Sequence, residues 1–370
     1  MATRVSALRP RPGILDITPY VGGRSRAPGA SSGRVIKLAS NESPLGPSPR
    51  AVAAYRAAAE TLHRYPDGAA VGLRAALAGR HGVDAARIVC GNGSDELLAL
   101  LARAYAGPGD EVLYSEYGFL VYPIAARAVG ATPVAAPEPA YRTDVDALLA
   151  HASPRTRLVY VANPNNPTGC HLPLSELRRL RAGLPNEALL VIDAAYAEYV
   201  GAADYGPGVE LVEASENVVM TRTFSKIYGL AAVRLGWAYC PSAVADVLNR
   251  IRGPFNVTGP ALAAGEAALD DDGHVAAARR HNDRWLPRFS TELEALGLTV
   301  HPSVANFVLV RFPDEEGLNA MAANDFLMAR GIIPRTMREY RLPDCLRITV
   351  GLEDEIEATV AALAAFMARA

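Results

Sequence analysis

The stretch RLVYVANPNNPTG at residues 157–169 runs from a continuously apolar segment into two Asn-Pro steps and a Thr-Gly pair. A second run, LLVID at 189–193, is also apolar over successive positions and ends on a carboxylate. Successive apolar residues are typical of parallel strands that helices cover on both faces. These two runs therefore predict an α/β domain with an open parallel sheet, in which ligands bind beyond the carboxyl ends of the strands.

Working outward from these runs, the rest of the chain continues the same alternation and then changes character. Further strands are predicted at 87–90, 111–114, 131–135, 217–221 and 235–239, and helices at 95–106, 119–129, 145–150 and 174–182. A long Ala-rich helical stretch is predicted at 258–296, followed by strands at 306–310 and 346–350 and a terminal helix from Glu353. We therefore expect three parts: an N-terminal arm (1–33), a large α/β domain (34–254) and a small C-terminal α+β domain (255–370).

Composition argues against several classes of function. The 370 residues carry 37 basic and 39 acidic side chains, a net charge of −2, which does not favour a nucleic-acid partner. No apolar run reaches the ~18 residues of a membrane span, and the first residues do not resemble a secretory signal. The cysteines Cys90, Cys170, Cys240 and Cys345 lie far apart. We therefore expect no metal site, no disulfides and a cytoplasmic location.

Lysine is scarce in this chain. Only Lys37 and Lys226 occur among the 37 basic residues, and the other 35 are Arg. Lys226 lies in TRTFSKIYGLAAVRLGW (221–237), a segment too apolar for an ordinary surface lysine. Apolar surroundings lower the pKa of an amine and leave it able to form an imine or move a proton, which Arg cannot do. Thr223, Ser225 and Arg234 in the same segment suit a phosphate group beside that amine.

Three further motifs follow predicted strands, and each also has an ordinary structural explanation. GNGSDE (91–96) predicts an anion site at a helix N-terminus, or simply a tight turn with a helix cap. NPNNPTG (163–169) offers the Asn166 amide to a ligand oxygen, or forms a rigid loop. VIDAAY (191–196) places Asp193 where it needs a cationic partner, with Tyr196 nearby, or uses Asp193 as a helix cap. Together these elements describe a site for pyridoxal 5′-phosphate (PLP).

With these motifs the chain resembles the fold-type I PLP-dependent aminotransferases, and among them most closely the histidinol-phosphate aminotransferases. The resemblance covers nearly the whole chain, from RPGILDITPYVGG and SNESPLGPSP through RYPDG and the motifs above to PSVANFVLV and LPDCLRITVG. It implies a large domain with a mostly parallel sheet between helices, plus a smaller α+β domain.

The resemblance also implies roles for particular residues. Lys226 would form the imine with the cofactor, and Asp193 would pair with its pyridine nitrogen. Asn166 and Tyr196 would flank its phenolic oxygen, and Tyr117 would stack on its ring. The residues expected to hold the phosphate are Gly93, Ser94, Thr223, Ser225 and Arg234, with Asp95 close by and Tyr65 reaching in from a neighbouring subunit. The residues expected to face the substrate are Tyr20, Asn41, Arg335 and Arg347.

The implied function is transamination between histidinol phosphate and 2-oxoglutarate, giving imidazole acetol phosphate and glutamate, in histidine biosynthesis. The implied assembly is a homodimer with shared active sites. Two alternatives remain on the same scaffold: an aromatic amino-acid aminotransferase, and a PLP-dependent decarboxylase of an amino-acid phosphate. The extra arginines Arg338 and Arg341, near the expected substrate side, leave the donor open. A ligand-sensing domain without activity is disfavoured, because the chain carries Lys226 and no appended DNA-binding motif.

Overall fold

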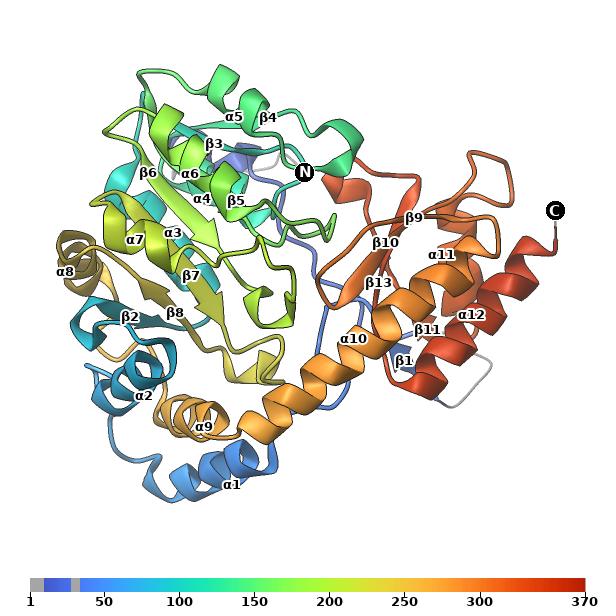
Figure 1. The fold of residues 1–370 in the computed structure, drawn as a ribbon, viewed down its shortest axis with the longest axis horizontal. Helices are drawn as coiled ribbons and strands as arrows, with labels where there is room; N and C mark the ends of the chain where they lie inside the picture. Colours follow the sequence, from blue (N-terminus) through green and yellow to red (C-terminus); the bar gives the residue numbers. More distant parts are fainter. Residues whose placement is uncertain (1–9, 28–33, 370) are drawn as a thin grey trace, which may run out of the picture.

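The computed structural model describes residues 10–27 and 34–369. It contains two structural units, and the long helix at residues 272–294 runs from one toward the other (Figure 1). The larger unit is built around a seven-stranded sheet and the smaller one around a four-stranded antiparallel sheet. The predicted fold class is confirmed: a mostly parallel sheet between helices, plus a smaller α+β unit.

The large sheet has the strand order β2-β8-β7-β6-β5-β3-β4. Its strands are β2 (Ile88–Gly91), β3 (Glu111–Ser115), β4 (Thr132–Ala136), β5 (Thr156–Ala162), β6 (Leu189–Asp193), β7 (Val218–Thr223) and β8 (Gly236–Tyr239). The neighbouring pairs from β7 to β4 are parallel, whereas β8 runs antiparallel to both β7 and β2. A parallel return from β7 would need a helical crossover, and the segment 224–235 carries only a short 3₁₀ turn, which brings β8 back antiparallel.

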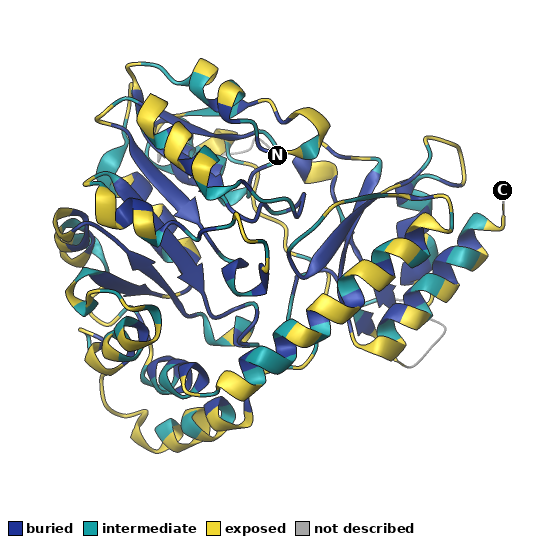
Figure 2. Ribbon diagram, viewed as in Figure 1, coloured by how far each residue is buried: buried dark blue, intermediate teal, exposed yellow. Residues whose placement is uncertain are grey.

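Helices cover both faces of this sheet, as the continuous apolar strands require. One face packs against α3 (Ser94–Tyr105), α4 (Val121–Ala128) and α8 (Ser242–Ile251). The other packs against α2 (Val71–His81), α5 (Val145–His151), α6 (Leu174–Gly183), α7 (Val209–Ala214) and α9 (Gly259–Leu269). Successive strand residues such as Val112 and Leu113 enter opposite cores. In Figure 2 the strands are accordingly dark blue, while the outer sides of the helices are yellow.

The smaller unit has the sheet order β12-β13-β10-β9. Its strands are β9 (Thr299–His301), β10 (Phe307–Arg311), β12 (Arg335–Thr336) and β13 (Cys345–Thr349), and its helices are α10 (Asp272–Glu294), α11 (Ala320–Met328) and α12 (Glu353–Met367). A two-stranded parallel pair joins β1 (Ile36–Lys37) to β11 (Ile332–Ile333). Residues near the N-terminus are thereby tied to the small unit before the chain enters α1 (Pro49–Ala58).

The expected domain boundaries and helices differ from this arrangement at three points. Residues 36–37 lie on the small unit, although 34–254 was expected to form the large one. Helix α9 packs against α1 and α2, so the large unit extends past the expected boundary at 254. The single helical stretch expected at 258–296 is two helices, because the acidic run 270–272 interrupts it and Asp271 caps α10 by accepting a hydrogen bond from the His274 backbone N–H.

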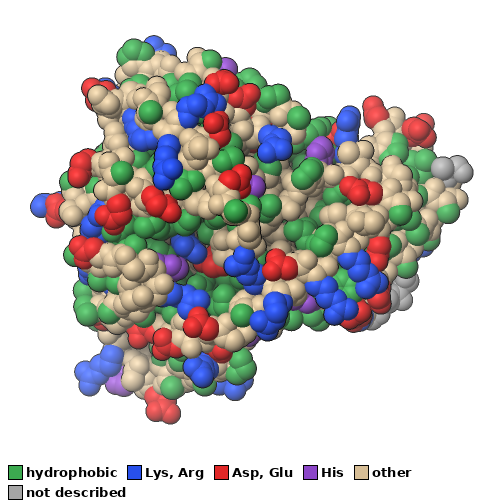
Figure 3. Space-filling model, in the orientation of Figure 1, with side chains coloured by type: hydrophobic (Ala, Val, Ile, Leu, Met, Phe, Trp, Pro, Cys, Tyr) green, Lys and Arg blue, Asp and Glu red, His purple; other side chains and the backbone are tan. Residues whose placement is uncertain are grey.

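The expected arm is described over residues 10–27, while its residues 1–9 and 28–33 lie outside the described ranges. Arg11 donates a hydrogen bond to the Ala128 carbonyl, and Tyr20 packs edge-on against Phe119, so this segment runs over α4. On the face shown in Figure 3, basic and acidic side chains intermingle. Within the described ranges, no helix has the length and apolar character to cross a membrane.

Candidate active site

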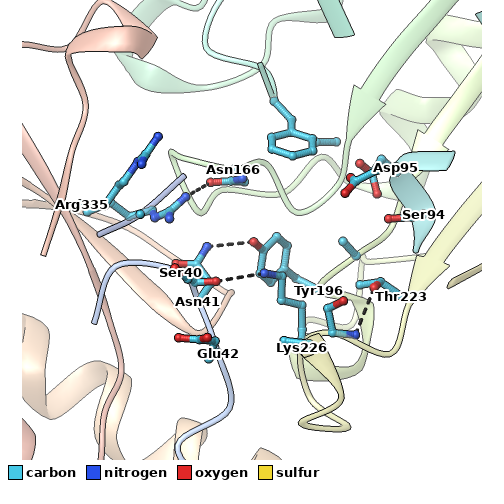
Figure 4. A pocket seen from close by; sticks show the side chains of 18 of the residues that line it. Ser40, Asn41, Glu42, Ser94, Asp95, Asn166, Tyr196, Thr223, Lys226 and Arg335 are labelled. Atoms are coloured by element: carbon cyan, nitrogen blue, oxygen red, sulfur yellow. Dashed lines mark hydrogen bonds between the residues drawn. The ribbon is translucent and has the colours of Figure 1, made fainter. Parts of the chain in front are cut away.

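A cavity of about 250 Å³ collects most of the residues that the sequence singles out (Figure 4). It lies beyond the carboxyl ends of β5, β6 and β7, and β12, β13 and the segment after β1 also contribute to its lining. The expected site residues in its lining are Tyr20, Asn41, Ser94, Asp95, Asn166, Asp193, Tyr196, Thr223, Ser225, Lys226, Arg234, Arg335 and Arg347.

Lys226 lies just after β7, in the segment that turns back toward β8. Its Nζ donates a hydrogen bond to the Ser40 carbonyl at 3.2 Å and lies 5.7 Å from the centre of the Tyr196 ring. Burial, assisted by the positive charge of Arg347, lowers the pKa of Lys226 to about 8. About a tenth of this amine is therefore uncharged at pH 7, and the uncharged amine is the nucleophilic and basic form.

Asp193 ends β6 and is buried. Its Oδ2 accepts a hydrogen bond from the Tyr122 hydroxyl at 2.9 Å, and its Oδ1 accepts a longer one from Thr221 Oγ1 at 3.4 Å. Burial raises the pKa of Asp193 to about 6, and the Tyr122 hydrogen bond opposes that rise. No cationic side chain in residues 10–27 or 34–369 forms an ion pair with this carboxylate. A cationic ligand atom would offset the cost of burying it.

Backbone, hydroxyl and guanidinium groups form an anion cradle at the start of α3. Gly93 precedes the helix with a φ of +78° and supplies no side-chain cap, and Ser94 is the first helical residue. The guanidinium of Arg234 donates to Ser225 Oγ at 3.2 Å and to Asp95 Oδ2 at 3.1 Å. A Cβ at Gly93 would collide with that guanidinium. The helix N-terminus, the hydroxyls and the Arg together suit a phosphate dianion.

On another wall of the cavity, Arg347 fixes the orientation of Asn166. Its guanidinium donates to Asn166 Oδ1 and, at 2.9 Å, to the Ala39 carbonyl. The amide Nδ2 of Asn166 is thus the group left to donate to a ligand oxygen. Asn41 Nδ2 donates to the Tyr196 hydroxyl at 2.8 Å, and burial raises the pKa of Tyr196 to about 12, so its phenol keeps its proton.

Both arginines expected at the substrate are buried beside aromatic rings. Arg335 donates to the Val21 carbonyl at 2.6 Å and lies 6.0 Å from the centre of the Tyr20 ring. Neither Arg335 nor Arg347 forms an ion pair with an acidic side chain of the described residues, so both are available to an anionic ligand. The extra arginines, Arg338 and Arg341, are exposed and lie outside the cavity lining.

Three expected residues lie outside the lining. Gly93 packs behind Arg234, in keeping with a backbone role. Tyr65 is 82% exposed and stacks on Phe255 at 4.5 Å, outside the cavity lining of its own chain. Tyr117 stacks on Tyr141 at 5.6 Å, and from the same turn Phe119 lines the cavity. The stacking of Tyr117 on the cofactor ring therefore stays a prediction.

Sequence reasoning also missed Tyr122 and the backbone of 39–40. Tyr122 lies on an amphipathic helix, where a tyrosine ordinarily indicates core packing, so its hydroxyl contact with Asp193 had no signal in the sequence. Phe119 did have one, since it follows Tyr117 by two residues in the same strand-to-helix turn. The described residues contain no group of three or more His, Cys, Asp or Glu that could hold a metal ion.

The donor set fits PLP. The cradle at α3 suits its phosphate, the Asp193 carboxylate suits a protonated pyridine nitrogen, and the Asn166 amide suits its phenolic oxygen. The uncharged amine of Lys226 suits its aldehyde. These four features line one cavity and come from four different loops at one edge of the sheet.

Comparison with known proteins places this geometry among aminotransferases. Residues 33–363 match the family model for aminotransferase class I and II. The chain is 60% identical to a histidinol-phosphate aminotransferase of Paramagnetospirillum magneticum, over 98% of this chain and 99% of that protein. It is 62% identical to one of Rhodospirillum centenum, over 96% and 97%. The crystal structure of the Sinorhizobium meliloti histidinol-phosphate aminotransferase in complex with pyridoxal-5′-phosphate superposes with a TM-score of 0.89, at 30% identity over 99% of both chains.

Proposed function

The chain belongs to the class I and II aminotransferase family, and from this premise we propose that it is a PLP-dependent histidinol-phosphate aminotransferase. It interconverts histidinol phosphate and imidazole acetol phosphate, with 2-oxoglutarate and glutamate as the second pair, in histidine biosynthesis. The observation that carries this function is one cavity that holds Lys226, Asp193 and the anion cradle together with two unpaired arginines, Arg335 and Arg347.

When bound, PLP supplies a pyridine ring that delocalises the electron pair left on the substrate α-carbon. Lys226 Nζ, with a pKa lowered to about 8, would move that proton from the substrate α-carbon to the C4′ atom of the cofactor. Asp193 holds a proton on the pyridine nitrogen by charge pairing, and Tyr122 orients the carboxylate from behind. The Tyr196 phenol and the Asn166 amide are the donors toward the phenolic oxygen.

The substrate side must accept a phosphomonoester in one half-reaction and a dicarboxylate in the other. Guanidinium groups bind both anions through the same two-pronged hydrogen bonding, so Arg335 and Arg347 can serve both. Tyr20 and Phe119 pack edge to face at 6.2 Å beside them, and their rings suit the imidazole of the donor. A phosphate dianion gains more from two arginines than a single carboxylate does, because it offers more charge and more acceptor oxygens.

We further propose a homodimer in which Tyr65 reaches the phosphate in the partner's active site. Tyr65 and Phe255 form an exposed aromatic pair, and a separate apolar depression of about 480 Å³ is lined by α1 and the segment that follows Lys226. Exposed apolar surface of this kind is typical of an interface. We also propose a cytoplasmic location, since all four cysteines are free.

The test is a comparison of kcat/KM for histidinol phosphate, histidine, phenylalanine and tyrosine as donors to 2-oxoglutarate, on one preparation. We expect histidinol phosphate to exceed the others. Neutralising Arg347 should reduce the rates with histidinol phosphate and with glutamate together, because both anions use it. Higher kcat/KM for phenylalanine or tyrosine would replace this function with aromatic amino-acid transamination. Release of CO₂ without a keto-acid product would indicate the decarboxylase.

A further inference from the structure

Glu138 is a buried carboxylate that the reaction above does not use. It lies between β4 and the turn at 139–141, is 4% exposed, and forms no ion pair with a cationic side chain of the described residues. Its oxygens are satisfied by three hydrogen-bond donors instead. Oε2 accepts from the Tyr117 backbone N–H at 2.7 Å, and Oε1 accepts from Thr143 Oγ1 at 2.9 Å and from Asn165 Nδ2 at 3.0 Å.

Two of these donors belong to loops that line the active site. The Tyr117 N–H lies in the turn from β3 to α4, and two residues later that turn presents Phe119 to the cavity. Asn165 lies in the NPNNPTG loop directly before Asn166, whose amide also lines the cavity. Glu138 itself lies outside the lining. One carboxylate therefore joins the loop that supplies the aromatic ring to the loop that supplies the amide donor.

The chemistry of the position requires an acceptor at both oxygens. The Tyr117 N–H at Oε2 and the Asn165 Nδ2 at Oε1 can only donate, so an amide in place of the carboxylate would direct its own N–H₂ at one of them. Asn165 shows that this contact is maintained at a cost, because its Oδ1 is buried and has no hydrogen-bond partner in the described part of the chain. Burial also raises the pKa of Glu138, as expected for a carboxylate without a cation, while the hydrogen bonds oppose that rise.

We propose that Glu138 is a positioning residue. It holds the side chains of Phe119 and Asn166 at fixed positions relative to each other, so that both contact the bound cofactor. This inference rests on the proposed function, since it concerns how the PLP ring and its phenolic oxygen are contacted. Glu138 acts through the backbone of one loop and the Asn165 side chain of the other, and touches neither substrate nor cofactor.

The decisive variant is Glu138→Gln, which keeps the shape and removes the second acceptor. Its matched control is Glu111→Gln. Glu111 is likewise buried in the same sheet, but it lies at the opposite end of β3 and is bound by Ser153 and Arg155, away from the site. We expect Glu138→Gln to bind PLP about tenfold more weakly, the loss typical of one hydrogen bond to a charged group. We also expect a shift in the pH midpoint of the visible absorbance of the bound cofactor. Glu111→Gln should change neither quantity.

A second variant covers the possibility that Glu138→Gln does not fold. Asn165→Ala removes one contact and keeps the carboxylate, and it should weaken PLP binding and shift the same midpoint in the same direction. Wild-type PLP affinity and spectra in Glu138→Gln, or equal losses in Glu111→Gln, would overturn the proposal while leaving the proposed function intact. A wild-type protein that binds no PLP would overturn the proposed function and this inference with it.

Discussion

Lys226 and Lys37 are the only lysines in the chain, which makes the active-site amine easy to follow. Lys226 is partly buried and its pKa is lowered to about 8, whereas Lys37 pairs with Glu42 at 2.7 Å. A lowered pKa means that the uncharged, reactive form appears as the pH rises through about 8 rather than through the ordinary 10.5. Lys226 should therefore react with electrophiles at a pH where an ordinary lysine is still protonated.

We expect trinitrobenzenesulfonate to modify Lys226 of the cofactor-free protein at a rate that rises with pH around a midpoint near 8, as set by that lowered pKa. Peptide mass spectrometry assigns the modified residue. Lys226→Arg keeps the charge and removes the reactive amine, so this phase should vanish while Lys37 is still modified. A phase with a midpoint near 8 that persists in Lys226→Arg and does not map to the α-amino group, which ordinarily titrates in the same range, would contradict the assignment.

Tyr122 controls the charge of Asp193 from the side away from the cavity. Its hydroxyl stabilises the charged carboxylate, so Tyr122→Phe should raise the pKa of Asp193 further above about 6. Because activity needs the carboxylate, the acid limb of the kcat/KM profile should move to higher pH. The rate at neutral pH should fall about tenfold. Asp193→Asn removes the carboxylate altogether, so its rate should be lower than that of the wild type by several orders of magnitude.

Tyr160→Phe is the matched control for this variant. The Tyr160 ring stacks on Tyr122 at 4.7 Å, but its hydroxyl donates to the Leu98 carbonyl at 2.6 Å rather than to Asp193. It should cost stability without moving the acid limb. Equal pH profiles for both variants would mean that Tyr122 acts only through packing.

For single residues, the motifs predict which side chains line the cavity far better than they predict the side chains outside the lining that hold them in place. Lys226, Asp193, Asn166 and Arg234 end or follow strands, where sequence alone places them at one sheet edge. The hydroxyl of Tyr122 and the carboxylate of Glu138 reach the site only because α4 and β4 pack where they do. That packing depends on contacts between segments far apart in the chain, which no local pattern records.

Among the elements, the turn before α3 makes a specific demand on one residue. Gly93 has a φ of +78°, which disfavours any side chain, and a Cβ there would displace the Arg234 guanidinium from the anion cradle. Gly109 has a φ of +93° but nothing within 4 Å of an added Cβ. An alanine at either position would therefore have a strained backbone. Only at position 93 would its methyl group also collide with another side chain.

Gly93→Ala and Gly109→Ala should each lose about 1 kcal/mol of unfolding free energy from backbone strain. Only Gly93→Ala should also weaken PLP binding, because the Arg234 side chain must move. Thermal unfolding gives the first quantity, and titration of the cofactor-free protein with PLP gives the second. Similar PLP affinities for the two variants would show that Arg234 does not hold the phosphate.

Elements with long apolar runs were predicted closely, and short or interrupted ones were not. β5 and β6 coincide with RLVYVA and LLVID nearly to the residue, since both faces are buried. β1 and β11 have two residues each and exist only because they pair with one another across the sequence. The break between α9 and α10 depends on an acidic run that also suits a helix start, so composition alone did not reveal it.

Across the whole molecule, the cavity depends on both units at once. Asn41 and Arg347 link them, since Asn41 bonds to Tyr196 of the large unit while its backbone N–H donates to Thr349 on β13. Arg347, also on β13, holds Asn166. Tyr65 is 82% exposed and does not line the cavity of its own chain. In the proposed homodimer, a second copy of the chain buries Tyr65 and Phe255 and places the phenol at the partner's phosphate.

Paired variants distinguish a shared site from one completed within a single chain. Lys226→Ala and Tyr65→Ala, co-expressed with different tags and isolated as a mixed dimer, should recover about half of wild-type activity if Tyr65 acts across the interface, because one of two sites is then intact. If Tyr65 served its own chain, both sites would stay defective. Lys226→Ala paired with Asp193→Asn is the control, since neither arrangement restores a site. A fully active monomer on sedimentation would contradict the shared site, because a single chain leaves Tyr65 in solvent.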